Sequence, residues 1–187
     1  ELENQVKRML SDPRSEALAT RFAAQWLRLQ DLEKIHPDAL TFPYFDETLA
    51  EAMHRETEVF FSHIVEADRP VLELLTADYT FVNERLALHY GIPGIYGSHF
   101  RRVNLGPELD YRRGLLGKGS FLSITFTQNF RTSPVKRGVW ILENILGSPA
   151  PAPPPNVPAL PDDENEGTGT APSLREQMTL HRTMEPC

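Results

Sequence analysis

The feature that most constrains the fold is a run of seven prolines between Pro149 and Pro161. Proline fixes its own backbone torsion and has no amide hydrogen to donate, so a run this dense adopts extended, polyproline-like backbone. Residues 162–166 are almost entirely acidic, and two glycines follow them. We therefore expect a solvated linker over residues 149–172, with a packed part before it and a short segment after it.

Apolar side chains before the linker recur at intervals of three and four, the spacing of one face of a helix. One stripe, expected to face a core, comprises Leu18, Phe22, Trp26 and Leu29, and a second comprises Leu49, Met53, Phe60 and Ile64. Val135, Val139, Leu142 and Leu146 form a third, which Trp140, Ile141 and Ile145 widen. The width of this third stripe predicts a helix over 134–146 that is buried on most of its circumference.

Capping residues set the expected ends of these helices. Pro13 suits the first position of a helix that runs to about residue 30, and Asp46 can cap a long helix that reaches about Glu66. Asn83 can cap a segment that Gly91 closes. Ser133 followed by proline marks the start of the helix over 134–146.

Residues 91–114 contain five glycines and two prolines, which favours a loop, with one short strand over 100–105. The fold class is therefore mainly α: a bundle-like multi-helix module, a smaller helical module, a proline-rich tether and a C-terminal helix. We place the modules at 1–94 and 112–148, joined by a loop over 95–111. The linker over 149–172 leads to the last helix, over 173–187, which a Ser173-Leu174-Arg175-Glu176 capping box opens.

Composition excludes two classes of function. The chain has 187 residues and a formal net charge of −7, and this acidic balance argues against nucleic-acid binding, which needs clustered cations. No apolar run approaches the roughly 18 residues of a membrane-spanning helix. The single cysteine is Cys187, so no disulfide forms within the chain.

Motif searches identify no catalytic residues and no metal site, and they leave open whether the chain is an enzyme. Gly114, Gly117 and Gly119 have the wrong spacing for a phosphate loop, and close helix packing explains them better. Glu51-Ala-Met-His54 is one copy of a unit that di-iron bundles use twice. With Glu56, Glu58 and His63 nearby, these residues are interpreted as a solvated polar face.

Two cationic features allow a ligand-binding alternative. Arg131, Ser133, Lys136 and Arg137 surround the start of a helix, where unpaired amide groups favour an anion. The competing interpretation is that the arginines tie the loop to acidic neighbours such as Glu143. His89, at the end of another helix, is interpreted as a capping residue whose cation the helix dipole favours.

Several strings together resemble a known family: tandem domains of unknown function in large cytochrome-associated proteins of planctomycetes and similar environmental bacteria. The first module, about 8–94, carries Phe22-Ala23-Ala24-Gln25-Trp26-Leu27, Ala77-Asp78-Tyr79-Thr80-Phe81-Val82-Asn83 and His89-Tyr90-Gly91-Ile92-Pro93-Gly94. The partner module, about 112–187, carries Arg113-Gly114-Leu115-Leu116, Arg131-Thr132-Ser133-Pro134-Val135-Lys136-Arg137-Gly138 and Glu143-Asn144-Ile145-Leu146-Gly147.

In that family, the segment similar to Leu174–Arg182 leads into a Pro-x-Cys-x-x-Cys-His run, the signature of covalent haem c attachment. The resemblance implies that Cys187 is the first cysteine of such a site, and that haem c is bound only if the chain continues past it. His181 and Met184 are of residue types that ligate haem iron. The resemblance also implies an exported protein, periplasmic or extracellular, because haem c is attached outside the bacterial cytoplasm.

These observations favour a non-catalytic helical scaffold of a multidomain c-type cytochrome, in electron transfer or coupled oxidation. Its expected partners are other domains of the same polypeptide or a larger redox assembly. Two alternatives stay open: an enzyme or binding module for an anionic or carbohydrate ligand at the Arg131–Arg137 cluster, and a structural assembly subunit of a larger complex.

Overall fold

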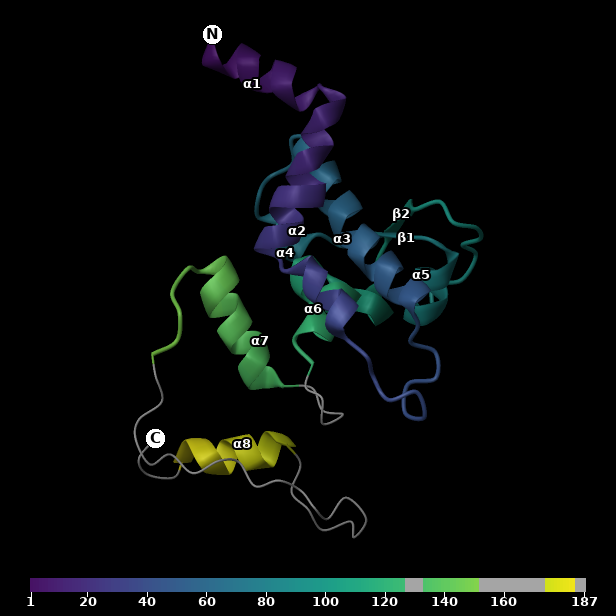
Figure 1. Ribbon diagram of the computed structural model, residues 1–187, viewed down its shortest axis with the longest axis vertical. Coiled ribbons are helices and arrows are strands. Elements are labelled where there is room, and N and C mark those ends of the chain that lie inside the picture. Colours follow the sequence, from purple (N-terminus) through teal and green to yellow (C-terminus); the bar gives the residue numbers. More distant parts are fainter. Residues whose placement is uncertain (127–132, 152–173, 184–187) are drawn as a thin grey trace. The chain divides into compact units, whose positions relative to one another are not determined.

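The computed structural model describes residues 1–126, 133–151 and 174–183, and it confirms the mainly α fold class (Figure 1). The chain divides into two compact units, Glu1–Ser148 and Pro149–Cys187. In the second unit, the described element is the helix α8 (Leu174–Thr183). The first unit holds the other elements and a single two-stranded sheet among the described residues.

The elements of the first unit follow one another closely along the chain. The α-helices are α1 (Leu2–Leu10), α2 (Ala24–Trp26), α3 (Glu47–Glu66), α4 (Glu73–Thr76), α5 (Glu84–Tyr90), α6 (Gly119–Ile124) and α7 (Pro134–Trp140), and the strands are β1 (Tyr79–Val82) and β2 (Arg101–Asn104). The 3₁₀ segments are η1 (Pro13–Glu16), η3 (Leu29–Lys34), η4 (Pro107–Arg112) and η5 (Leu115–Gly117), and the π-helical segments are η2 (Leu18–Ala23) and η6 (Ile141–Ile145).

Helix α3 is the central element of this unit. The predicted stripe of Leu49, Met53, Phe60 and Ile64 is buried as expected. Asp46 caps the helix as predicted, because its carboxylate accepts a hydrogen bond from the Leu49 amide at 2.8 Å. The face that carries this stripe is covered by η2, η3, α5, α6 and β1. Segments from both halves of the unit therefore pack on one helix.

The two strands form an antiparallel pair in which Tyr79 lies opposite Asn104 and Val82 opposite Arg101. Strand β2 confirms the strand expected over 100–105. Strand β1 was missed, because all four of its residues are buried and the sequence shows no alternation of apolar and polar residues. The next helix, α5, begins and ends as predicted: Asn83 accepts from the Leu86 amide at 2.9 Å, and Gly91 has φ +72°.

The helix expected from Pro13 to about residue 30 is confirmed only in part: the segment is helical from Pro13 to Trp26, but it is not one regular α-helix. The segment passes from 3₁₀ to π to α geometry and breaks at Arg28, whose φ is +59°. A π-helix has more residues per turn, so Phe22 rotates away from the predicted face, whereas Leu29 of the same stripe is buried and Trp26 packs against the core. Phe22 is 58% exposed as a result, and the small residues Ala19 and Ala23 take the buried positions.

The expectation that the helix over 134–146 is buried on most of its circumference is also wrong. Ser133 caps α7 as predicted, and its hydroxyl accepts from the Lys136 amide at 3.1 Å. Only Trp140 is buried in α7 and η6, whereas Val135 is 53% exposed. The π-helical turn after Trp140 changes the rotation per residue, so Trp140 alone is buried, while Ile141 and Ile145 pack against the core as partly buried residues.

Candidate functional site

The most unusual feature of the described structure is a carboxylate and an ammonium group buried together in the core. The side chain of Glu56, on α3, is 1% exposed, and that of Lys118, which precedes α6, is 0% exposed. Their charged atoms, Oε1 and Nζ, are 3.5 Å apart. The Thr80 hydroxyl bridges them, since it accepts from Lys118 Nζ at 2.7 Å and donates to Glu56 Oε1. The ammonium also lies 4.0 Å from the centre of the Phe60 ring.

Tyr90 is the hydrogen-bond partner of the second oxygen of the Glu56 carboxylate. Its hydroxyl donates to Oε2 at 2.7 Å and accepts from the Gly119 amide at 2.8 Å. The Arg112 guanidinium stacks 4.1 Å above the Tyr90 ring. Glu56, Thr80, Tyr90, Lys118 and Gly119 therefore form one hydrogen-bonded set, which we call the buried polar network.

The burial of Glu56 overturns its predicted place on a solvated polar face. Glu56 lies between Met53 and Phe60, three residues after one and four before the other, so helical geometry places all three on the same face. This spacing was the signal that the sequence offered. When the apolar face of a helix is covered by other elements, a polar residue within that face is buried too.

Lys118 has a less obvious sequence signal. It stands between Gly117 and Gly119, and a Cβ atom at either glycine would clash: with Arg112 backbone at 2.3 Å, or with the Tyr90 hydroxyl at 2.9 Å. The predicted reason for these glycines, close packing, is therefore confirmed. Gly114, with φ +57°, is similar, since its Cβ would lie 2.3 Å from the Leu75 carbonyl oxygen.

A second polar contact runs beside the network. The hydroxyls of Thr57, on α3, and Ser120, on α6, are 2.7 Å apart, and both residues are buried. Two adjacent residues of α3 are thus joined to the start of α6 by hydrogen bonds. Directional contacts of this kind define the relative position of α3 and α6 more strictly than apolar packing alone.

The electrostatics of the network follow from its burial. Removal from water disfavours the ammonium and lowers the pKa of Lys118. Burial and the adjacent Glu56 carboxylate raise the pKa of Tyr90 well above its ordinary value, so the phenol stays protonated and donates. Both charged groups are almost fully buried, and their contacts join α3 to the residue that precedes α6.

Tyr90→Phe is expected to cost about 1–3 kcal/mol, because Glu56 and the Gly119 amide each lose a buried partner. The raised pKa of Tyr90 gives a stabilisation that is complete below about pH 10 and declines above it, as the unfolded tyrosine ionises first. We therefore expect the difference between wild type and variant to shrink above pH 10. Urea denaturation over a pH series measures this difference in the free energy of unfolding. A difference independent of pH would contradict the claim that the Tyr90 phenol is buried and protonated.

The Glu51–His54 unit does not become a metal centre in the described structure. His54 Nε2 lies 3.5 Å from a Glu58 oxygen, and Arg55 binds the other oxygen of Glu58 at 2.8 Å. These contacts with His54 and Arg55 lower the pKa of Glu58. Among residues 1–126, 133–151 and 174–183, no group of three His, Cys, Asp or Glu side chains is arranged to hold a metal ion.

Three of the remaining predicted site residues fall outside the described structure. Arg131 belongs to the gap between residues 126 and 133, and Met184 and Cys187 follow the last described residue. His181 lies within helix α8. Lys136 is exposed and Arg137 half-buried on α7. His89 lies in the last turn of α5, where desolvation and the cations Arg112 and Arg85 lower its pKa, which works against the cation expected there.

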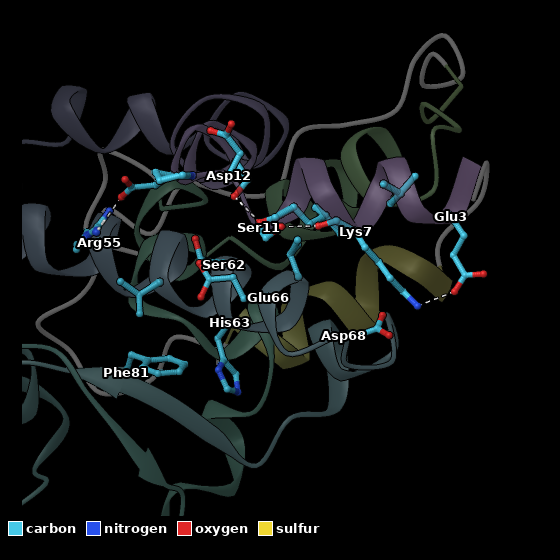
Figure 2. A pocket seen from close by; sticks show the side chains of 17 residues that line it. Glu3, Lys7, Ser11, Asp12, Arg55, Ser62, His63, Glu66, Asp68 and Phe81 are labelled. Atoms are coloured by element: carbon cyan, nitrogen blue, oxygen red, sulfur yellow. Dashed lines mark hydrogen bonds and ion pairs between the residues drawn. The ribbon is translucent and has the colours of Figure 1, made fainter. Parts of the chain in front are cut away.

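A groove opens between α1 and α3, with a volume of about 1040 Å³ (Figure 2). Val6 and Lys7 line one wall, and Val59, His63 and Glu66 line the other. Its surface mixes apolar and acidic side chains, and the His63 ring lies beside that of Phe81, at a centroid distance of 5.2 Å. Residues of the buried polar network do not line this groove.

Comparison with protein families gives two matches in tandem. Residues 1–92 match the family model PSD4, described as a protein of unknown function (DUF1592), and residues 112–187 match PSCyt3, a protein of unknown function (DUF1588). No curated protein and no solved structure matches the chain. Glu56, Thr80 and Tyr90 come from the first match, and Lys118 and Gly119 from the second. As the resemblance indicated, the chain carries two tandem domains of unknown function: a match to DUF1592 over residues 1–92 is followed by a match to DUF1588 over residues 112–187.

Proposed function

We propose that this chain is a non-catalytic helical scaffold within an exported, multidomain c-type cytochrome that acts in electron transfer or coupled oxidation. The chain's role is to hold the two domains at a fixed geometry and to carry a haem module on the tether that follows them. The redox chemistry then belongs to the haem, and the scaffold sets its distance and orientation.

The observation that carries this proposal is the buried polar network across the two domains. The DUF1592 domain contributes the carboxylate, and the DUF1588 domain contributes the ammonium that neutralises it. Separation of the domains would leave a buried charge unpaired on each side, which is strongly unfavourable. A joint of this kind suits a scaffold, because relative motion of the domains would require the pair to break.

Three observations support the haem part of the proposal. The name of the second family model, PSCyt3, points to an association with cytochromes. Pro186-Cys187 agrees with the start of the Pro-x-Cys-x-x-Cys-His run that the resemblance implies. The seven prolines between Pro149 and Pro161 would act as a semi-rigid spacer between the joined domains and that run.

The test is covalent haem in a longer polypeptide that continues past Cys187, expressed in a bacterium that exports it and attaches haem c. We expect a Soret band, and haem staining that survives denaturation. Cys187→Ser should weaken the staining, because only one of the two thioether bonds can then form. His181→Ala is the matched control and should keep the covalent stain. An exported, correctly folded protein without covalent haem would refute the proposal.

A further inference from the structure

Helix α1 presents an apolar stripe to solvent. Leu2, Val6 and Met9 follow one another at intervals of four and three residues, which places them on one face. Leu2 is 80%, Val6 46% and Met9 61% exposed, and no residue of α1 is buried. A stripe of large apolar side chains on an otherwise charged helix is the pattern of a helix that packs against another helix.

The exposed apolar surface continues beyond α1. Val6 and Met9 line a hollow of about 640 Å³ together with Leu18, on η2. Phe22, one turn further along η2, is 58% exposed. A nine-residue helix spans only about 14 Å, at 1.5 Å per residue, and is too short to form a stable interface alone. Leu18, on η2, extends the apolar surface beyond α1.

The charges beside the stripe indicate which helix fits it. Glu1 and Glu3 lie at the start of α1, and Lys7 and Arg8 lie near its end. Glu3 and Lys7 lie on one side of the stripe, where they form an ion pair of 2.7 Å. The helical repeat places Arg8, and the N-cap residue Glu1, toward the other side. When two identical helices pack antiparallel, each flank meets the same flank of its partner in reverse order. Both flanks then bring an acid against a base, whereas parallel packing would bring like charges together.

The groove beside α1 adds to this complementarity (Figure 2). Its lining includes the acidic side chains Glu16, Glu66 and Asp68 in addition to Glu3, against the cations Lys7 and Arg55. An arriving helix therefore meets a surface with more negative than positive charge. The basic end of a second α1 supplies the opposite charge.

We propose that the chain forms a two-fold symmetric dimer through α1, with the α1 helices of two copies antiparallel along the Leu2, Val6 and Met9 stripe. Such an interface is self-complementary, so each residue makes its contact twice. In the dimer, Glu3 pairs with Lys7 of the second copy and Glu1 pairs with Arg8 of the second copy. This assembly is independent of the haem proposal, and would place two scaffolds side by side.

Sedimentation velocity of the 187-residue chain over a concentration series tests the dimer. Val6→Asp should weaken the association at least about tenfold, since a carboxylate would be buried at the centre of the contact. Leu40→Asp is the matched control: Leu40 is 93% exposed and lies outside α1, so this variant should dimerise as wild type does. Circular dichroism verifies that Val6→Asp keeps its helical content.

A mixing experiment separates this contact from effects within one chain. Lys7→Glu with Arg8→Glu makes one α1 acidic, and Glu1→Lys with Glu3→Lys makes the other basic. Each double variant alone should be a monomer, whereas an equimolar mixture should form a heterodimer. A wild-type chain that stays monomeric, a dimer unaffected by Val6→Asp, or a mixture without heterodimer would each overturn the proposal.

Discussion

Lys118→Met is expected to lower the free energy of unfolding by about 3–5 kcal/mol, the cost of leaving one partner of a buried ion pair without the other. Methionine fills a similar volume, so the loss reports the missing charge and not a cavity. Glu56 would be left in the core with Thr80 and Tyr90 as partners but no cation. It must then carry an uncompensated charge or bind a proton on folding. Urea denaturation at neutral pH measures the loss.

A double variant distinguishes the ion pair from general damage to the core. Lys118→Met with Glu56→Leu removes both charges, and apolar replacement of a whole buried pair is often close to neutral. We expect it to regain much of the stability that Lys118→Met loses, although Thr80 and Tyr90 keep unsatisfied hydroxyls. Lys136→Met, at an exposed lysine, should change stability by less than about 0.5 kcal/mol. Equal losses in the single and double variants would refute the ion-pair explanation.

Trp140→Ala should have an effect of similar size, about 3–5 kcal/mol, the usual cost of truncating a buried aromatic residue. Trp140 is the only buried residue of α7 and η6, and its ring packs edge-on against Phe121, at a centroid distance of 4.8 Å. Its removal should loosen α7 from the core as well as leave a cavity. Chemical denaturation gives the loss, and amide hydrogen exchange shows whether α7 becomes less protected.

Val135→Ala provides the control within the same helix. Val135 is 53% exposed, so its truncation should change the free energy of unfolding by less than about 0.5 kcal/mol. If Val135→Ala and Trp140→Ala cost the same, α7 would be held by the broad apolar face that the sequence pattern predicted. The conclusion that Trp140 is the main contact between α7 and the core would then be wrong.

Local signals allowed the helix ends and the central helix to be predicted. Asp46, Asn83 and Ser133 each accept a hydrogen bond from a backbone amide of the first helical turn, because short polar side chains satisfy amides that the helix leaves free. The stripe on α3 was predictable for a similar reason, since regular α geometry converts sequence spacing directly into a face. Such signals involve neighbours within a few positions of one another.

The burial of Glu56 could have been inferred from its spacing to Met53 and Phe60, but its pairing with Lys118 was not predictable, because that relation is tertiary. Glu56 and Lys118 are 62 positions apart, and neither the acid nor the base alone indicates a partner. The π-helical segments η2 and η6 were missed for another reason. They change the rotation per residue, so side chains that should share a face under regular α geometry diverge.

Native-state amide hydrogen exchange tests most directly whether the DUF1592 and DUF1588 domains are joined as one unit. The amides to compare are those of Phe60 and Phe61 in α3 with that of Leu122 in α6, which donates to the Lys118 carbonyl at 3.1 Å. We predict that they open only by global unfolding, with the same free energy and the same dependence on denaturant. If α6 opens with a much lower free energy than α3, the claim that the two domains are joined as one unit is wrong.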